Sequence, residues 1–234
     1  MNLDEAHDLI DMLLDKVDQP YFTDDEKNMF IDQAISAFIN GHYQFYEQEQ
    51  VSRDALASFI YYKSVKNNEH YATDDTWEAG IARLPDNYVH LIQISLVYKP
   101  PSGSSANPSF EDGNQAKIVG VKDFYDRLYS SDPFNKATKE DPIAYVRQDA
   151  TSAYIGFYPT IPASTATFAY TGKYRYNCLV FKDHSECFND NPQNALKELY
   201  QREIIDITVR KMIGNIEGAG IQFQQIETEQ SKPI

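Results

Sequence analysis

Residues Ile143 to Arg175 read IAYVRQDATSAYIGFYPTIPASTATFAYTGKYR, and this stretch decides the fold class. Within it, Tyr154 to Tyr158 is a short apolar run, and Thr165 to Tyr174 alternates between aromatic residues and threonines. Alternation with period two is typical of a half-buried antiparallel strand. Prolines lie between the two runs, where a missing N–H group costs no ladder hydrogen bond. The stretch therefore predicts a strand, a turn, a strand, a turn and a strand.

Helical patterns lie on both sides of this predicted sheet. Asn2 to Val17 carries apolar residues at three- and four-residue spacing, which predicts an amphipathic helix. Thr23 is followed three residues later by Glu26, a capping box that marks the start of a second helix. A third and longer helix is expected to begin at Asn191 and Pro192 and to run to about Ile213.

The C-terminal helix has an apolar pattern that changes side midway. On a helical wheel one face carries Leu196, Leu199, Tyr200, Ile204 and Ile207. The opposite face carries Ile205, Val209, Met212 and Ile213. A helix whose two halves bury opposite faces needs two different partners. The pattern predicts that one partner is the N-terminal hairpin and the other is a separate layer or another chain.

These patterns together predict an α+β fold that forms one interrupted domain. Residues 1–50 are expected to form a helical hairpin, and residues 51–190 a β-rich insert with short helices, built as an antiparallel sheet or sandwich. Residues 191–214 are expected to pack on the N-terminal helices as the C-terminal helix, and residues 215–234 to form a tail.

The amino-acid composition argues against several classes of function. The formal net charge is −14, which argues against a protein that grips nucleic acid through its phosphates. Aromatic residues make up 13% of the chain, and tyrosine-rich surfaces are typical of interfaces. The acidic N-terminus does not resemble a signal peptide, no run is long enough for a membrane span, and two cysteines make no disulfide framework. We therefore expect synthesis in a reducing cytoplasm.

No motif in the sequence predicts catalysis. Phosphate-binding, dinucleotide-binding and nucleophile-elbow motifs are missing from it, and we expect neither an enzyme nor a cofactor. Cys178, His184 and Cys187 are the one candidate zinc set, but their spacing departs from paired Cys-x2-4-Cys ligands. A loop with incidental polar residues is the preferred interpretation. We accordingly expect serine at both cysteine positions to change the melting temperature little.

The order of these features resembles a known family. The chain carries a helical hairpin, the turn LPDNY before an apolar strand, the segment DPFN, the strand end YIGFYP, the return strand ATFAYTGKYR, and the final helix NPQNALKELYQREIIDITVRKMIG. This combination resembles the head-to-tail adaptor, or neck ring, proteins of tailed bacteriophages, most of all those of podovirus-like phages such as the crAss-like group. The similarity runs from Asn2 to about Gly214.

The resemblance implies a structural virion protein. About a dozen copies would form a homo-oligomeric ring at the neck, extending the DNA channel between the portal protein and the tail. DNA would pass without sequence-specific binding, the neighbours would be the portal protein or other neck rings, and no membrane would be involved. Residues 214–234 are then the candidate portal-binding tail. The candidate interface residues are Ile221, Phe223, Ile226, Phe157, Tyr158 and Met212.

A second hypothesis is a monomeric binding module that recognises its ligand through an aromatic-rich β-sheet. It differs from the adaptor in remaining monomeric. Acidic pairs such as Asp24 with Asp25 also raise a metal-dependent hydrolase, but this pair belongs to a predicted helix cap and favours a solvated surface.

Overall fold

The chain divides into two compact units. A computed structural model describes residues 1–15, 22–65, 80–99, 114–132, 134–138, 141–148, 152–158, 171–189 and 196–230. One unit combines Met1–Phe59 with Phe181–Ile234, and the other is the continuous segment Ile60–Val180. The first is helical and the second is mainly β, so the fold is α+β, as predicted.

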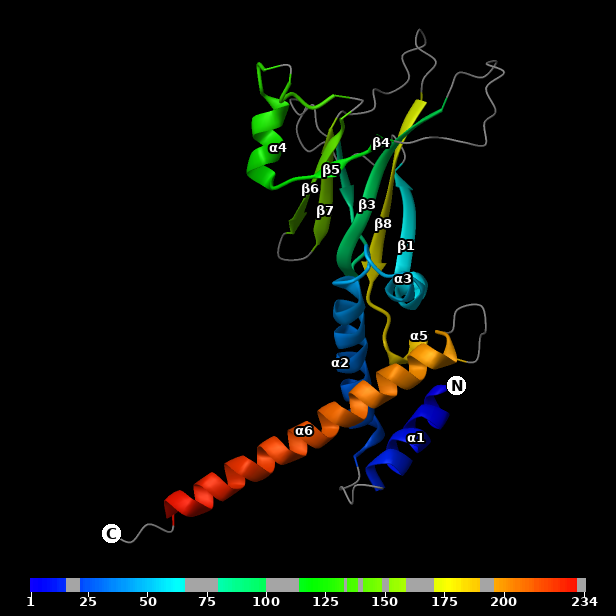
Figure 1. Cartoon of the computed structure of the whole chain (residues 1–234), viewed down its shortest axis with the longest axis vertical. Coiled ribbons are helices and arrows are strands. Elements are labelled where there is room, and N and C mark those ends of the chain that lie inside the picture. Colours follow the sequence, from blue (N-terminus) through cyan, green and yellow to red (C-terminus); the bar gives the residue numbers. More distant parts are fainter. Residues whose placement is uncertain are drawn as a thin grey trace. The chain divides into compact units, whose positions relative to one another are not determined.

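The helical unit is built from segments of both chain ends (Figure 1). Its elements are α1 (Leu3–Asp15), α2 (Asp24–Tyr43), α3 (Gln50–Leu56), the 3-10 helix η1 (Ala57–Phe59), α5 (His184–Cys187) and α6 (Glu198–Gln230). The predicted capping box is confirmed: the Thr23 side chain accepts from the backbone N–H of Glu26, whose carboxylate accepts from the backbone N–H of Thr23. This pair fixes the first residue of α2.

α2 is the central element of the helical core and packs against both α3 and α6. Its buried apolar side chains recur at helical spacing: Phe30, Ile31, Ala34, Ile35, Phe38 and Ile39. The Phe38 ring lies 6.1 Å from the Tyr200 ring of α6 and 6.2 Å from the Phe59 ring of η1. Each of the phenylalanine and isoleucine side chains contributes about 1.5–3 kcal/mol when removed from water.

α6 differs from the predicted C-terminal helix in its length and in its buried face. It passes through Gly214 without a break and ends at Gln230, so residues 215–230 are helical rather than a tail. Gly costs a helix only about 1 kcal/mol relative to Ala, which is too little to stop it. Residues 190–195, where the predicted start falls, lie outside the described residues.

The predicted change of apolar side in α6 is wrong. The buried helical residues are Tyr200, Gln201, Ile204, Ile205, Thr208 and Met212. At about 100° per residue these positions span a single arc of about 140°. Leu199, expected on the buried face, is 71% exposed. One continuous face of α6 therefore packs on α1 and α2.

A buried lysine joins α1 to α2. The side chain of Lys27 is only 5% exposed, and its Nζ lies 2.7 Å from Oδ2 of Asp11 and 3.2 Å from Oδ1 of Asp24. Burial lowers the pKa of Lys27, but the hydrogen bonds and charges of Asp11 and Asp24 outweigh it, so the pKa is raised above its ordinary value. The cation is therefore held in its charged form by its two carboxylate partners.

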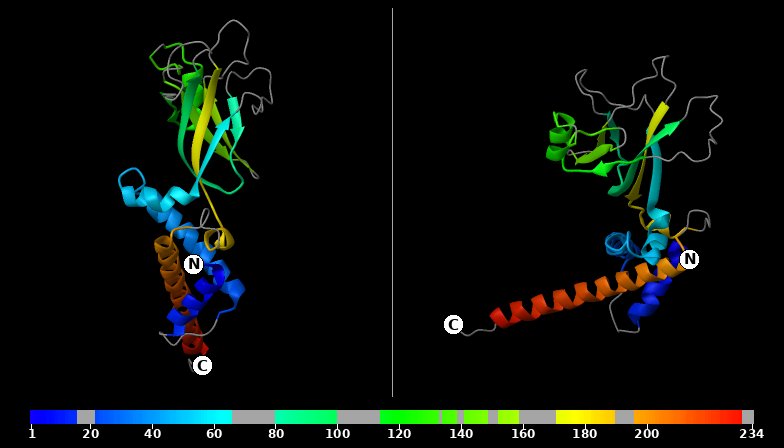
Figure 2. Two further views of the ribbon diagram at one scale, coloured as in Figure 1. Left: turned by 90° about the vertical axis from the view of Figure 1, so that its right-hand side faces the viewer. Right: turned by 45° about the horizontal axis from the view of Figure 1, so that its top comes forward.

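The second unit contains two four-stranded sheets (Figure 2). Its elements are β1 (Ile60–Val65), β2 (Gly80–Arg83), β3 (Tyr88–Lys99), β4 (Asn114–Gln115), β5 (Lys117–Ile118), α4 (Val121–Leu128), β6 (Ile143–Gln148), β7 (Ala153–Tyr158) and β8 (Thr171–Val180). One sheet has the order β1-β8-β3-β4 and the other β2-β7-β6-β5. Alternating side chains of both sheets share one core, which includes Ile94, Ile155 and Tyr176. The insert is therefore a β-sandwich, as predicted.

The three strands of the stretch Ile143–Arg175 do not lie in one sheet. β6 and β7 form an antiparallel hairpin in the second sheet, with Tyr145 opposite Gly156. β8 belongs to the first sheet, where it pairs with β1 on one side and β3 on the other. The expected strand Thr165 to Tyr174 overlaps the start of β8, and its first part, residues 165–170, lies outside the described residues. Local alternation identified strands here, whereas partners far along the chain determine the sheets.

The helix α4 covers the outer face of the β6–β7 hairpin and lies beside β6 (Figure 1 and Figure 2). Phe124 and Leu128 of α4 are buried against Tyr145 and Ile143 of β6. A Cβ atom at Gly156 would overlap the ring of Tyr145, which therefore crosses directly over this glycine. The absence of a side chain at residue 156 lets the aromatic ring lie flat on the strand.

Candidate functional site: an acidic pocket and an exposed turn

One face of α2 forms the floor of an open pocket on the helical unit. The pocket has a volume of about 580 Å³ and is lined by Asp25, Asn28, Met29, Asp32, Gln33, Ser36, Phe181 and His184. The six α2 residues recur at three- and four-residue spacing, so they share one side of the helix. We refer to these eight residues as the acidic pocket. They include two carboxylates, and no lysine or arginine of the described residues lines the pocket.

The short helix α5 places a histidine against the floor of the acidic pocket. The backbone N–H of His184 donates to Oδ1 of Asp32 over 2.8 Å, and the ring Nδ1 lies 3.1 Å from the same oxygen. Asp183 caps α5 by accepting from the backbone N–H of Glu186 over 3.0 Å. A hydrogen bond from the Ser185 hydroxyl lowers the pKa of Asp183, which keeps this cap ionised. The cap fixes where α5 begins and hence where His184 lies.

The chemistry of the acidic pocket is that of a binding site for a cationic or hydrogen-bond-donating group. The Ser36 hydroxyl donates to the backbone oxygen of Asp32 over 3.1 Å, so it is engaged within its own helix. Asp25 and Asp32 supply carboxylate oxygens, whereas Met29 and Phe181 supply apolar surface. Six of the eight lining residues are polar and two are apolar, which suits a group that carries positive charge together with some apolar surface.

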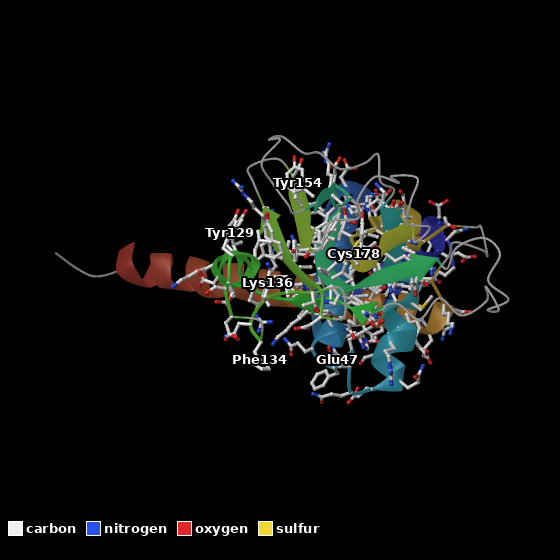
Figure 3. The ribbon with its side chains drawn as sticks, turned by 90° about the horizontal axis from the view of Figure 1, so that it is seen from above. Glu47, Tyr129, Phe134, Lys136, Tyr154 and Cys178 are labelled. Carbon is white, nitrogen blue, oxygen red and sulfur yellow. The ribbon has the colours of Figure 1, made fainter. Side chains whose placement is uncertain are left out.

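A second surface feature follows α4 in the β-sandwich unit. Phe134 is 96% exposed, and Lys136, two residues later, is also exposed; both are labelled in Figure 3. Asp132 holds this segment: its Oδ1 accepts from the backbone N–H of Phe134 over 3.0 Å, and its Oδ2 accepts from the Asn135 side chain over 2.8 Å. We refer to Asp132 with residues 134–136 as the exposed turn. The Asp and Asn of DPFN are residues typical of such turns.

The candidate interface residues predicted from the sequence do not lie at either of these features. Phe157 and Met212 are fully buried in their units, so neither side chain reaches the surface of the single chain. Tyr158 is half-buried against the cluster that α4 forms with β6. The remaining candidates lie within the helical backbone of α6, and their side chains fall outside the described residues: Ile221, Phe223 and Ile226.

The candidate zinc set is separated in the fold. Cys178 is buried in the sandwich core, and Cys187 is buried in the helical unit with its Sγ 3.7 Å from the backbone oxygen of Lys182. His184 is engaged by Asp32. In the part of the chain that the structure describes, no three histidine, cysteine or acidic side chains gather as metal ligands.

The burial of both thiols also corrects the expectation for their serine variants. Cys178 is 0% exposed and Cys187 is 2% exposed, so serine would place a hydroxyl in each core. An unsatisfied buried hydroxyl costs about 1–3 kcal/mol. We therefore expect Cys178→Ser to lower the melting temperature clearly, as thermal unfolding followed by circular dichroism would measure. Cys178→Ala, which buries no polar group, is the matched control and should lose less stability.

Both thiols are expected to make stability fall at alkaline pH. Burial raises the pKa of Cys178 to about 11 and that of Cys187 to about 12, from an ordinary value of 9.0. As the pH rises, the thiols lose their protons in the unfolded chain before they do so in the folded one. Their contribution to the free energy of unfolding is therefore fully present below pH 9 and is lost as the pH rises through the folded-state pKa values. Each thiol contributes a slope of up to about 1.4 kcal/mol per pH unit in that window.

Urea unfolding at pH about 7, about 9 and about 10.5 measures this slope. The double variant Cys178→Ala with Cys187→Ala should lose less stability than the wild type between the last two conditions. Equal losses in the two proteins would contradict the assignment of the slope to the thiols.

Comparisons with known proteins identify no relative of the chain. No family model matches it, and no curated protein matches it in sequence. Among the described residues, no helix combines the length and apolar character that crossing a bilayer requires.

The sequence named Asp25 and His184 as members of other candidate sites, and it did not predict the acidic pocket for a physical reason. Asp32 and His184 are 152 residues apart, and only tertiary packing brings them together. Asp32 sits on the polar side of an amphipathic helix, where a carboxylate ordinarily indicates a solvated surface. The exposed turn did carry a local signal in DPFN, but that signal predicts a turn and not the exposure of its phenylalanine.

Proposed function

We propose that this protein is a structural subunit of a ring in the head-to-tail connector of a tailed bacteriophage. The ring would contain about a dozen copies and would extend the DNA channel between the portal protein and the tail. The proposal would place the protein in the virion neck after assembly in the cytoplasm of the bacterial host. Its basis is the resemblance in the order of sequence features, together with the surface of the chain.

The observation that carries the proposal is the number of large apolar side chains left exposed on both units. They include Phe134 at 96%, Tyr129 and Leu199 at 71%, Tyr62 at 69%, Val51 at 65% and Met12 at 57% exposed. Single exposed apolar residues are ordinary on a monomer. Several large ones, with an aromatic residue almost wholly in water, are typical of a chain that buries surface against other subunits.

The charge of the chain supports a channel role. A net charge of −14 repels the DNA backbone, so a ring built from this chain would hold few phosphates and would let DNA pass. A protein whose function is to hold DNA would instead need clusters of lysine and arginine, which displace the counterions of the phosphates.

The proposal is tested by the assembly state of the full chain. Native mass spectrometry and negative-stain microscopy would follow the purified protein alone and mixed with the portal protein of the same virion. We expect closed rings, either alone or on the portal. A protein that remains monomeric in both conditions would contradict the ring.

A second candidate function is a monomeric binding module, and one observation favours it. The edge strand β1 exposes Tyr62 at 69% and Tyr61 at 40%, which gives the sandwich an aromatic rim that a ligand could contact. The same assembly experiment separates the two functions, because a binding module stays monomeric with the portal protein present.

Deletion of residues 214–234 tests the role of the end of α6. The buried residues described in α6 end at Met212, so the shortened chain should keep its helical core and its circular dichroism per residue close to that of the wild type. We expect it to lose co-purification with the portal protein. Retention of the portal by the shortened chain would show that this segment is not the portal contact.

A further inference from the structure

The exposed turn presents an aromatic side chain on a hydrogen-bonded backbone. Besides the two side-chain bonds to Asp132, the backbone oxygen of that residue accepts from the N–H groups of Asn135 and Lys136 over 3.1 and 3.0 Å. The Ser130 hydroxyl in turn accepts from the backbone N–H of Asp132 over 3.1 Å. A backbone held by these hydrogen bonds loses little conformational entropy when the turn binds, so its phenylalanine can serve as an interface anchor.

The acidic pocket matches the exposed turn in chemistry. The turn offers an aromatic ring and, two residues later, a lysine. The pocket offers the apolar surfaces of Met29, itself 51% exposed, and Phe181, together with the carboxylates of Asp25 and Asp32. Its volume lies within the range of about 300–1,000 Å³ that is typical of pockets for small ligands and anchoring side chains.

We infer that the exposed turn of one copy binds in the acidic pocket of a second copy of this chain. Phe134 then packs on Met29 and Phe181, and the Lys136 ammonium faces the carboxylates of Asp25 and Asp32. This inference rests on the proposed ring and names the contact between its neighbours.

The geometry of such a contact favours a ring over a simple dimer. The two surfaces differ, so each copy offers a turn to one neighbour and a pocket to the other. Head-to-tail contacts of this kind repeat, and they close into a ring when the rotation between neighbours allows it. Charge complementarity between Lys136 and the pocket orients the neighbours, whereas the buried ring of Phe134 supplies most of the affinity.

Two variants, each lacking one surface, test the contact. Phe134→Ala with Lys136→Glu removes the turn, and Asp25→Lys with Met29→Arg removes the pocket, and all four residues lie at the surface. Each variant alone should associate at least about 30-fold more weakly than the wild type in sedimentation velocity, as expected for loss of a hot spot. Their equimolar mixture should form one-to-one dimers that grow no further, because one intact turn and one intact pocket remain.

Matched controls separate this contact from general damage. Lys122→Glu on α4 changes the same charge at another exposed position, and Leu199→Ala removes an exposed apolar side chain on α6. Lys122→Glu should assemble like the wild type, whereas Leu199→Ala shows how much a loss of exposed apolar surface elsewhere weakens assembly. The combination Lys136→Glu with Asp25→Lys should recover association that either change alone weakens, because the attraction is restored with reversed signs.

Disulfide formation between engineered cysteines detects the contact even if the copies associate too weakly for sedimentation. Phe134→Cys in one batch and Met29→Cys in another should give a mixed disulfide dimer on mild oxidation, above the level of Lys122→Cys paired with Met29→Cys. The native thiols are buried and their pKa values are raised, so they compete little. Failure to exceed the control pair would overturn the inference, as would a disulfide formed within one chain that carries both cysteines.

The outcomes also distinguish this inference from the proposed function. Rings that persist in both surface variants would overturn the contact and leave the ring proposal standing. A disulfide from the turn of the full chain to the portal protein, with none between copies, would assign the turn to a different neighbour and would likewise overturn the contact. A chain that never forms rings with the portal, yet gives the mixed disulfide, would support the contact and contradict the ring.

Discussion

Replacing Lys27 by methionine is expected to lower the free energy of unfolding of the helical unit by about 3 kcal/mol. The substitution removes the cation that faces Asp11, whose Oδ1 is already buried without a hydrogen-bond partner in the described residues. Removing one partner of a buried ion pair leaves an uncompensated charge, and this usually costs about 3–5 kcal/mol. The Asp11 side chain is 28% exposed, so we expect the lower end of that range.

Urea unfolding followed by circular dichroism measures this loss. Asp24→Asn is the matched comparison, because it removes the second carboxylate, whose side chain is 74% exposed, and should cost no more than about 1 kcal/mol. Adding Asp11→Leu to Lys27→Met should recover much of the stability, since the carboxylate that remains, Asp24, is 74% exposed to water. A loss of under about 1 kcal/mol in Lys27→Met would show that water reaches Asp11 freely.

Replacing Gly156 by alanine is expected to lower the free energy of unfolding of the sandwich by about 3 kcal/mol. The new methyl group would occupy the space of the Tyr145 ring, so either the strand or the ring must move. The ring cannot move freely, because it packs against Phe124 with ring centroids 4.5 Å apart. Overpacking of this kind usually costs about 1–3 kcal/mol, and a clash with a ring held on both sides lies at the upper end.

A second glycine provides the control for this variant. Gly41 lies in α2, and among the described residues no atom outside its own helical turn lies within 4 Å of the position that a Cβ atom would take there. Gly41→Ala should therefore stabilise the helical unit by about 0.5–1 kcal/mol. If Gly156→Ala lowers the free energy of unfolding and Gly41→Ala raises it, the clash with the Tyr145 ring is the cause of the loss at residue 156. Tyr145→Ala combined with Gly156→Ala should lose less stability than the sum of the single variants, and additive losses would contradict the clash.

Local signals predicted the parts of the fold that depend on neighbouring residues. The capping box located the start of α2, because both of its hydrogen bonds form within one helical turn. The short apolar run Tyr154 to Tyr158 predicted a strand, and β7 spans Ala153–Tyr158. These features depend on backbone sterics and side-chain spacing that the sequence displays directly.

Features that depend on distant partners could not be predicted in this way. β8 looked like the third strand of a meander, but its hydrogen bonds go to β1 and β3. Leu199 looked buried by periodicity, yet no element of the described part of the chain covers that side of α6 closely enough to remove it from water. The acidic pocket escaped for the same reason, because Phe181 and His184 reach α2 only through the fold.

The division of the chain into a continuous unit and a split one has a consequence for biosynthesis. The sandwich segment Ile60–Val180 leaves the ribosome whole, so it can fold while the C-terminal part is still being translated. The apolar face of α2 is covered by Tyr200 and the rest of α6, and α6 is translated long after α2. Nascent chains therefore expose that face to solvent until α6 has been translated, and chaperone capture at α2 would decide the yield of folded protein.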